Sequence, residues 1–130
     1  MKLLIVDDSE VVRTKLIAML SEIDDIEIAG QAKDGREAIR AIKQLRPDAV
    51  ILDIRMPGAS GIDILESVKG DLADCRVVIL TNYSYQQYRK RCMSAGADYF
   101  FDKSTEFEKV IELMRDPVFR SAKRKNNESE

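Results

Sequence analysis

Histidine and tryptophan are absent from the 130 residues of this chain, and cysteine occurs only twice. Without histidine there can be no histidine-ligated metal site, no serine–histidine catalytic pair and no phosphohistidine. The remaining chemistry is that of carboxylates, hydroxyls and lysine. Cys75 and Cys92 have neither a CxxC nor a metal-ligand spacing, which favours two small buried side chains over a disulfide or a metal site.

Long apolar runs and a strong excess of one charge are also missing. No run approaches the ~20 residues of a membrane-spanning helix, and the chain becomes acidic at Asp7, too early for a signal peptide. We therefore expect a cytoplasmic protein without a membrane segment. A net charge of -2 gives no general basis for binding nucleic acid. Hydrophobic content of 45% and charged content of 34% indicate one ordinary globular domain.

Apolar strands alternate with amphipathic helices along the whole chain. The expected strands are residues 3–6, 26–29, 49–52, 77–80 and 97–101. A helix is expected after each strand, the last one ending at Asp116-Pro117. This alternation predicts an α/β fold with a doubly wound, five-stranded parallel sheet, order 2-1-3-4-5, and helices on both faces, as in flavodoxin-like proteins. Glu27 weakens the second strand, which suits an edge position.

The strongest functional signal is the run from Ala49 to Gly58, in which an apolar strand ends in the single carboxylate of Asp53. Alone, such a residue is more often a solvated strand end or a helix cap than a reactive group. In the predicted sheet, however, the carboxyl ends of all strands lie at one edge. Polar residues follow four of the five strands there: Asp7, Asp8, Asp53, Thr81 and Lys103.

Three carboxylates at one edge raise one another's pKa unless a cation compensates, and a hard ion with oxygen ligands, Mg²⁺, is the natural partner. With Lys103 and Thr81 beside them, such an edge could neutralise phosphoryl oxygens, and an aspartate can itself form an acyl phosphate. Asp53 is the candidate nucleophile. Taken singly, Asp7 and Asp8 could be charges at a helix N-terminus, Thr81 a cap and Lys103 a surface lysine.

Together these motifs resemble the receiver domain of two-component response regulators, over about residues 2–114. The matching pieces are Val6-Asp7-Asp8, Leu52-Asp53, Met56-Pro57-Gly58, Gly61, Leu80-Thr81, Ala95-Gly96-Ala97 and Lys103. The resemblance implies that Asp53 takes a phosphoryl group from a sensor histidine kinase or a histidine phosphotransfer protein. Asp8 and Asp53 would bind Mg²⁺ directly and Asp7 through water, and the Arg55 carbonyl would complete the protein ligands. Thr81 and Lys103 would hold the phosphoryl oxygens.

The resemblance also implies a signalling protein that catalyses only its own phosphorylation and dephosphorylation. Phe100 matches an aromatic switch that moves inward with Thr81. The implied output surface is the fourth helix, fifth strand and fifth helix, although its aromatic side chains could equally serve packing. These are Tyr85, Tyr88, Tyr99 and Phe107. Such a protein would signal by contact or pass its phosphoryl group onward, as a monomer or a weak dimer linked to phosphorylation.

Several features depart from the family pattern or extend beyond it. Ser104 follows Lys103 where many receivers have a cis-proline, so the resemblance does not fix that peptide. Arg55 and Tyr83 stand where receivers set the phosphoryl lifetime, and we hypothesise that their bulk lengthens it. We expect a receiver domain at residues 1–115 and a polar, flexible tail at residues 116–130, without an output domain. The basic run in that tail is expected to be solvated, with no direct contact to nucleic acid.

Three other functions were weighed against this one. A haloacid-dehalogenase-type phosphatase places a second aspartate two residues after its nucleophile, where this chain has Arg55. A flavodoxin-like electron carrier must cradle a phosphate after the first strand, where Asp7 and Asp8 would repel it, and no P-loop is present. A phosphorylation-independent pseudo-receiver that acts only as a docking module is the main alternative. The intact acidic residues, Thr81 and Lys103 argue against it.

Overall fold

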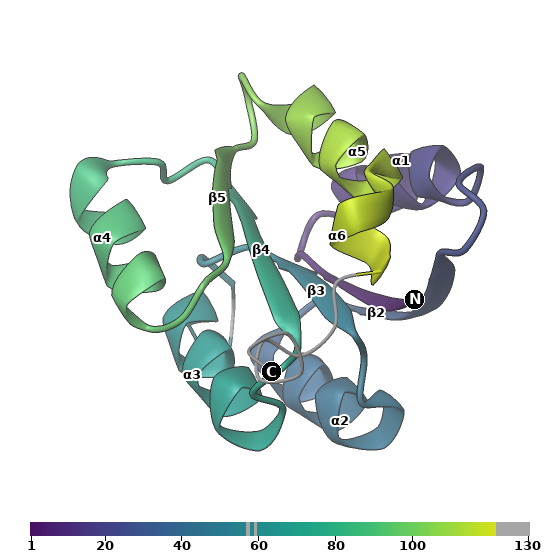
Figure 1. The fold of residues 1–130 in the computed structure, drawn as a ribbon. Coiled ribbons are helices and arrows are strands. Elements are labelled where there is room, and N and C mark those ends of the chain that lie inside the picture. The colour runs from purple at the N-terminus through teal and green to yellow at the C-terminus, as the bar shows by residue number, and fades with distance from the viewer. Residues whose placement is uncertain (57, 59, 122–130) are drawn as a thin grey trace, which may run out of the picture.

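The computed structural model describes residues 1–56, 58 and 60–121. Its strands are β1 (Lys2–Val6), β2 (Glu27–Ala32), β3 (Ala49–Leu52), β4 (Arg76–Thr81) and β5 (Tyr99–Asp102). Its helices are α1 (Glu10–Leu20), α2 (Gly35–Leu45), α3 (Gly61–Asp71), α4 (Gln86–Ser94), α5 (Phe107–Arg115) and α6 (Pro117–Ser121). The strands form one parallel sheet in the order β2-β1-β3-β4-β5, so the predicted fold class and strand order are confirmed (Figure 1).

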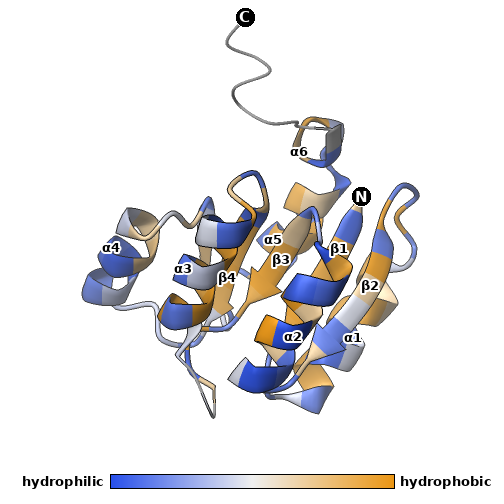
Figure 2. Cartoon of the chain, turned by 90° about the horizontal axis from the view of Figure 1, so that it is seen from below, coloured by the Kyte–Doolittle hydropathy of each residue, from blue (hydrophilic) through white to orange (hydrophobic). Residues whose placement is uncertain are grey.

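Two apolar cores sandwich the sheet, because side chains alternate between the faces of each central strand. One core joins the sheet to α2, α3 and α4. The other joins it to α1, α5 and α6. In β3 both sets are buried: Val50 and Leu52 point to the first core, Ala49 and Ile51 to the second. Figure 2 shows the consequence, apolar strands inside and helices with polar outer faces.

Three helices, α1, α2 and α3, begin where the sequence supplies a side-chain cap. The hydroxyl of Ser9 accepts from the Val12 N–H, and the carboxylate of Asp34 accepts from the Glu37 N–H. Ser60 caps α3 in the same way. Because each cap lies just past a strand end or its loop, the helices start at the carboxyl edge of the sheet. Their positive dipole ends therefore face the same edge as the candidate site.

Four of the five strands differ from their predicted bounds: β1 begins one residue earlier, β4 is one residue longer at each end, and β2 and β5 differ more. β2 extends to Ala32 rather than ending at residue 29, because hydrogen bonding to β1 outweighs the weak strand propensity of Gly30 and Gln31. Its register with β1 shifts once along the way. β5 begins at Tyr99 rather than at residue 97. Before it, the Asp98 N–H donates to the Val77 carbonyl at 2.9 Å, and the Val77 N–H donates to the Asp98 carboxylate at 2.8 Å.

The largest difference is α6, since residues 117–121 were expected to belong to a polar, flexible tail. Pro117 does not simply terminate α5; it is the first residue of a new helix, a position where proline's missing N–H costs nothing. Phe119 is only 3% exposed, and its ring meets that of Tyr99 edge-on at 5.7 Å. The remainder of the expected tail, residues 122–130, lies outside the described residues. Within the described chain, no helix is both long and apolar enough to cross a membrane.

Candidate functional site at the carboxyl edge of the sheet

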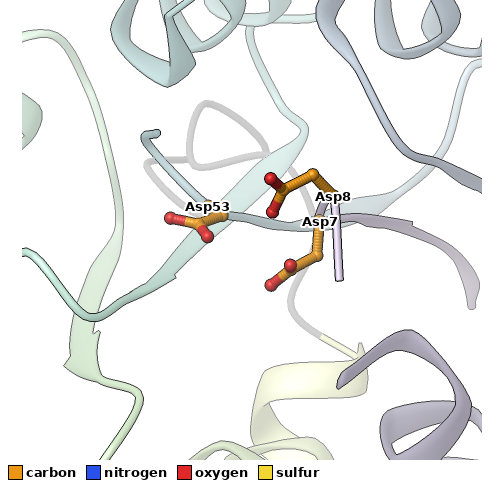
Figure 3. A group of neighbouring side chains, drawn as sticks. All are labelled: Asp7, Asp8 and Asp53. Atoms are coloured by element: carbon orange, nitrogen blue, oxygen red, sulfur yellow. The ribbon is translucent and has the colours of Figure 1, made fainter. Parts of the chain in front are cut away.

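Three carboxylates converge where the chain leaves β1 and β3 (Figure 3). Asp7 and Asp53 immediately follow these strands, and their backbone N–H groups extend the sheet, donating to the Ala32 and Val6 carbonyls at 3.0 Å. One carboxylate oxygen from each of Asp7, Asp8 and Asp53 lies within 4.8 Å of the others. Asp7 and Asp53 are buried and Asp8 is exposed. The arrangement is therefore rigid at its base and open to solvent on one side.

Lys103 joins the two buried carboxylates. Its Nζ lies 2.8 Å from Oδ2 of Asp7 and 2.9 Å from Oδ2 of Asp53. Burial raises the pKa of Asp7, although hydrogen bonds from Lys103 and the Ser9 N–H oppose that shift. Burial lowers the pKa of Lys103, but its bonds to the two carboxylates outweigh burial and the net shift is upward. One ammonium thus serves two buried carboxylates, which leaves an excess of negative charge.

Thr81 completes the strand-end set as the last residue of β4, and it is fully buried. Its hydroxyl oxygen accepts from the Tyr83 N–H at 3.1 Å, and its carbonyl accepts from the Lys103 N–H at 2.8 Å. The sheet therefore fixes Thr81 and Lys103 side by side. No cis peptide bond occurs among the described residues, so the Lys103–Ser104 bond is trans.

Gly61 sets the chain path directly after Asp53. Its N–H donates to the Ile54 carbonyl at 2.8 Å, and a Cβ on this glycine would lie 2.6 Å from the Asp53 carbonyl oxygen. Only a residue without a side chain permits this approach. Gly58 adopts a φ of +94°, as a turn glycine does, whereas the adjoining Pro57 of the same motif lies outside the described residues.

Arg55 and Tyr83 meet beside the carboxylates. The Arg55 guanidinium carbon lies 4.4 Å from the centre of the Tyr83 ring, a cation–π contact that joins the β3–α3 loop to the β4–α4 loop. The backbone N–H of Arg55 also donates to Oδ1 of Asp53 at 3.3 Å. Arg55 therefore contacts Asp53 through its backbone and Tyr83 through its side chain.

The aromatic residues of the expected output surface do not form one uniform group. Phe100 is buried, with the Arg89 guanidinium 5.2 Å from its ring centre. Tyr88 packs against both Tyr83 and Tyr85. Tyr85 is 62% exposed and Tyr99 is 37% exposed. Some of these aromatic side chains therefore pack against the rest of the protein, and others are exposed on the expected output surface.

One polar cluster beside the site escaped the sequence reasoning. Asp102 accepts from the Ser84 hydroxyl and from the backbone N–H groups of Ser104 and Thr105. An aspartate followed by serine and threonine is a turn signal that could have indicated the local bonds. The bond from Ser84 joins two loops, and no local pattern predicts it.

Comparison with known proteins identifies the fold and its relatives. The family model described as "Response regulator receiver domain" matches residues 3–115. Response regulator GacA of Pseudomonas aeruginosa is 32% identical over 114 residues, 88% of this chain and 53% of that protein. Response regulator protein VraR of Staphylococcus saprophyticus is 35% identical over 128 residues, 98% of this chain and 58% of that protein. The chain thus spans little more than half the length of these relatives.

Solved structures give the same answer. The response regulator domain of Thermotoga maritima CheB superimposes with a TM-score of 0.78 at 29% identity, covering 88% of this chain and 93% of that one. CheY in the CheX–CheY–BeF3–Mg²⁺ complex of Borrelia burgdorferi superimposes with a TM-score of 0.79 at 31% identity, covering 85% and 84%.

Proposed function

Because the chain belongs to the response regulator receiver domain family, we propose that Asp53 accepts a phosphoryl group and that the protein signals in its phosphorylated form. Receiver domains are signalling proteins of two-component systems rather than classical enzymes. The single observation that carries the proposal is the bridge from Lys103 Nζ to the buried carboxylates of Asp53 and Asp7, at 2.9 and 2.8 Å. It supports the proposal because a carboxylate that could act as the nucleophile lies beside a cation that could neutralise phosphoryl oxygens, at the carboxyl edge of the sheet.

The donor set fits Mg²⁺. Three carboxylate oxygens of Asp7, Asp8 and Asp53 lie close enough to share one ion, and oxygen is the ligand that this ion prefers. Asp8 and Asp53 would bind it directly, with Asp7 through water and the Arg55 carbonyl as a further ligand. When bound, Mg²⁺ would neutralise charge on the phosphoryl oxygens. The excess of buried carboxylate over ammonium supports the need for a second cation at this edge.

The chain's own residues would carry the transfer. A carboxylate oxygen of Asp53 attacks phosphorus, a P–O bond forms, and the P–N bond to the donor's imidazole breaks as that nitrogen keeps the electron pair. Lys103 moves from the carboxylate pair to a phosphoryl oxygen. The Thr81 hydroxyl, whose oxygen accepts from the Tyr83 N–H, donates its own proton to another phosphoryl oxygen. Asp53 is held in place meanwhile by the sheet hydrogen bond of its N–H to Val6.

The phosphodonor would be a sensor histidine kinase or a histidine phosphotransfer protein, because this chain has no histidine of its own. The phosphorylated form would act through the α4–β5–α5 face or pass the phosphoryl group onward. The partly exposed Tyr99 and the exposed Tyr85 suit a protein contact there. We propose a monomer, or a weak dimer linked to phosphorylation, in the cytoplasm, with no direct contact to nucleic acid.

Acetyl phosphate, a small phosphodonor, tests the proposal without the unknown kinase. With Mg²⁺, the wild-type protein should gain the mass of one phosphoryl group, stable in acid and labile in base. Asp53→Ala should gain none. Asp71→Ala is the matched control, because this exposed aspartate lies at the end of α3, and it should gain the group as the wild type does. An unmodified wild type that still captures partners would favour the docking-module function instead.

The stacked pair of Arg55 and Tyr83 should lengthen the life of phospho-Asp53 by hindering the attacking water. Replacing both with alanine should speed hydrolysis roughly tenfold, the effect of about 1.4 kcal/mol on a barrier. The measurement is the decay of the adduct after acetyl phosphate is removed, with Arg36→Ala as a control on α2. Unchanged decay in the double variant would refute the shielding role.

A further inference from the structure

The β4–α4 loop, residues 82–85, contacts the loops on both sides of it, and successive residues contact different loops. Asn82 and Ser84 contact the β5–α5 loop: the Ser104 hydroxyl donates to Oδ1 of Asn82 at 3.1 Å, and the Ser84 hydroxyl donates to Oδ2 of Asp102. Tyr83, between them, lies under the Arg55 guanidinium. The loop thus bridges the two neighbouring loops of the candidate site.

Asp102 is the fixed end of this tie. Its Oδ1 accepts from the N–H groups of Ser104 and Thr105 at 2.8 and 3.1 Å. Its own N–H donates to Oε1 of Glu106, whose N–H in turn donates to the Asp102 carbonyl, both at 2.8 Å. The β5–α5 turn therefore closes on itself and leaves Oδ2 for Ser84. The bond from Ser84 is the principal cause that lowers the pKa of Asp102.

The Ser84–Asp102 bond lies directly beyond the end of the β4–β5 ladder, next to Thr81 and Lys103, the two residues that would hold the phosphoryl group. Thr81 pairs with Asp102 at the end of the β4–β5 ladder, and the next N–H, that of Lys103, donates to the Thr81 carbonyl. Ser84 and Asp102 extend this pairing by one side-chain bond. The position of the loop is thereby linked to that of Thr81.

The Thr81 hydroxyl is engaged with its own loop, since it accepts from the Tyr83 N–H at 3.1 Å. A hydroxyl can accept from one partner and donate to another, so this bond leaves the proton of Thr81 free but fixes the position of its oxygen. A shift of that oxygen toward a phosphoryl group on Asp53 must either break the bond or carry with it a loop that the ties on Asn82 and Ser84 hold in place. We propose that the Ser84–Asp102 bond is a clasp that keeps the β4–α4 loop and Thr81 in their unphosphorylated arrangement. Ser84 and Asp102 are then positioning residues that act through Thr81.

This inference rests on the proposed phosphorylation of Asp53 and adds a control element to it. Opening of the clasp and phosphorylation favour each other, because coupling between two equilibria is reciprocal. A hydrogen bond to a charged group in a partly exposed loop corresponds to roughly a threefold to tenfold change in the balance of the two arrangements. Removing the clasp should therefore speed phosphorylation by that factor.

Ser84→Ala removes the hydroxyl and leaves the turn around Asp102 intact. With saturating Mg²⁺ and acetyl phosphate, the rate of adduct formation should rise, while the affinity for Mg²⁺ and the melting temperature remain near those of the wild type. Ser94→Ala, at the other end of α4, is the matched control and should leave the rate unchanged. Ser104→Ala, which removes the second tie, should change the rate in the same direction by a smaller factor.

The decisive measurement repeats Ser84→Ala in a Thr81→Ala background. If the clasp acts through Thr81, the acceleration disappears there. Acceleration that persists without Thr81, or no acceleration in Ser84→Ala and Ser104→Ala, would overturn the inference. Failure of the wild type to form any adduct would instead overturn the proposed function, so the two failures are distinguishable.

Discussion

The two ends of the sheet handle charge in opposite ways. At the amino end, near the starts of β4 and β5, Lys69 Nζ donates to the Cys75 carbonyl at 2.6 Å and to Oδ2 of Asp98 at 2.9 Å. That carboxylate also accepts from a backbone N–H. At the carboxyl end, one ammonium is shared between two buried carboxylates, with the exposed Asp8 beside them.

This difference separates charge that is balanced by its neighbours from charge that is not. Around Lys69 one cation meets one carboxylate, and the remaining bonds go to the backbone, so nothing further is needed. Around Lys103 negative charge remains in excess in a buried place, which is unfavourable unless another cation compensates. A cavity of about 420 Å³ lies at the amino end, lined by arginines and aspartates in equal number. A cavity lined by charged residues is therefore not enough to distinguish the carboxyl end of the sheet. What distinguishes it is the excess of carboxylates over ammonium groups around Lys103.

Replacing Lys69 or Lys103 with methionine should give the largest difference between the two ends of the sheet. Lys103→Met should slow adduct formation by about 100-fold, because it removes a cation from the phosphoryl oxygens. Lys69→Met should leave that rate unchanged and lower the free energy of unfolding by about 2 kcal/mol, because Asp98 loses its charged partner. Acetyl phosphate kinetics and urea unfolding measure the two effects. A slowed rate in Lys69→Met would contradict the division of roles.

The two glycines of α3 sharpen the comparison, since one lies at each end of the sheet. Gly61→Ala places a Cβ against the Asp53 and Ile54 backbone and should cost about 2–3 kcal/mol of stability. Gly70→Ala meets no atom within 4 Å and should add about 0.5–1 kcal/mol through helix propensity. Urea unfolding measures both, and adduct formation should suffer only in Gly61→Ala. Equal effects of the two substitutions would show that α3 is not anchored at Asp53.

Cys75 tests whether the amino end is chemically inert. Burial raises the pKa of its thiol to about 12, so the folded thiol should resist a disulfide reagent at pH 8. Because the thiol of the unfolded chain has its ordinary pKa of 9.0, the stabilisation is complete below that pH and is lost as the pH rises toward the pKa of the folded thiol. At pH 10 the loss is about 1.4 kcal/mol. Cys75→Ala should show a shallower decline of unfolding free energy above pH 9, and an identical decline would contradict the assignment.

The sequence was sufficient for the fold because its central strands are apolar on both faces and the first three helices each begin at a side-chain cap. The sheet order then placed Asp7, Asp8, Asp53 and Lys103 at one edge, where the structure has them, although their roles remain proposals. The bounds of β3 were predicted to the residue. Those of β2 were not, since an edge strand owes its length to pairing more than to propensity.

What the sequence could not supply depends on contacts between distant segments. α6 forms because Phe119 packs against Tyr99 and the second core, whereas the sequence pattern at Asp116-Pro117 predicts only the end of the preceding helix. The Ser84–Asp102 bond and the Arg55–Tyr83 stack each join two loops that only the folded sheet brings together. Local sequence patterns predict helices, strands and caps, but they do not predict which loops come into contact in the folded protein.

Locating the phosphoryl group on the chain tests the central claim most directly. After reaction with acetyl phosphate and Mg²⁺, borohydride converts an aspartyl phosphate to homoserine, and peptide mass spectrometry identifies the converted residue. The account predicts homoserine at position 53 alone, dependent on Mg²⁺. Conversion at Asp7 or Asp8, or no conversion at all, would contradict it.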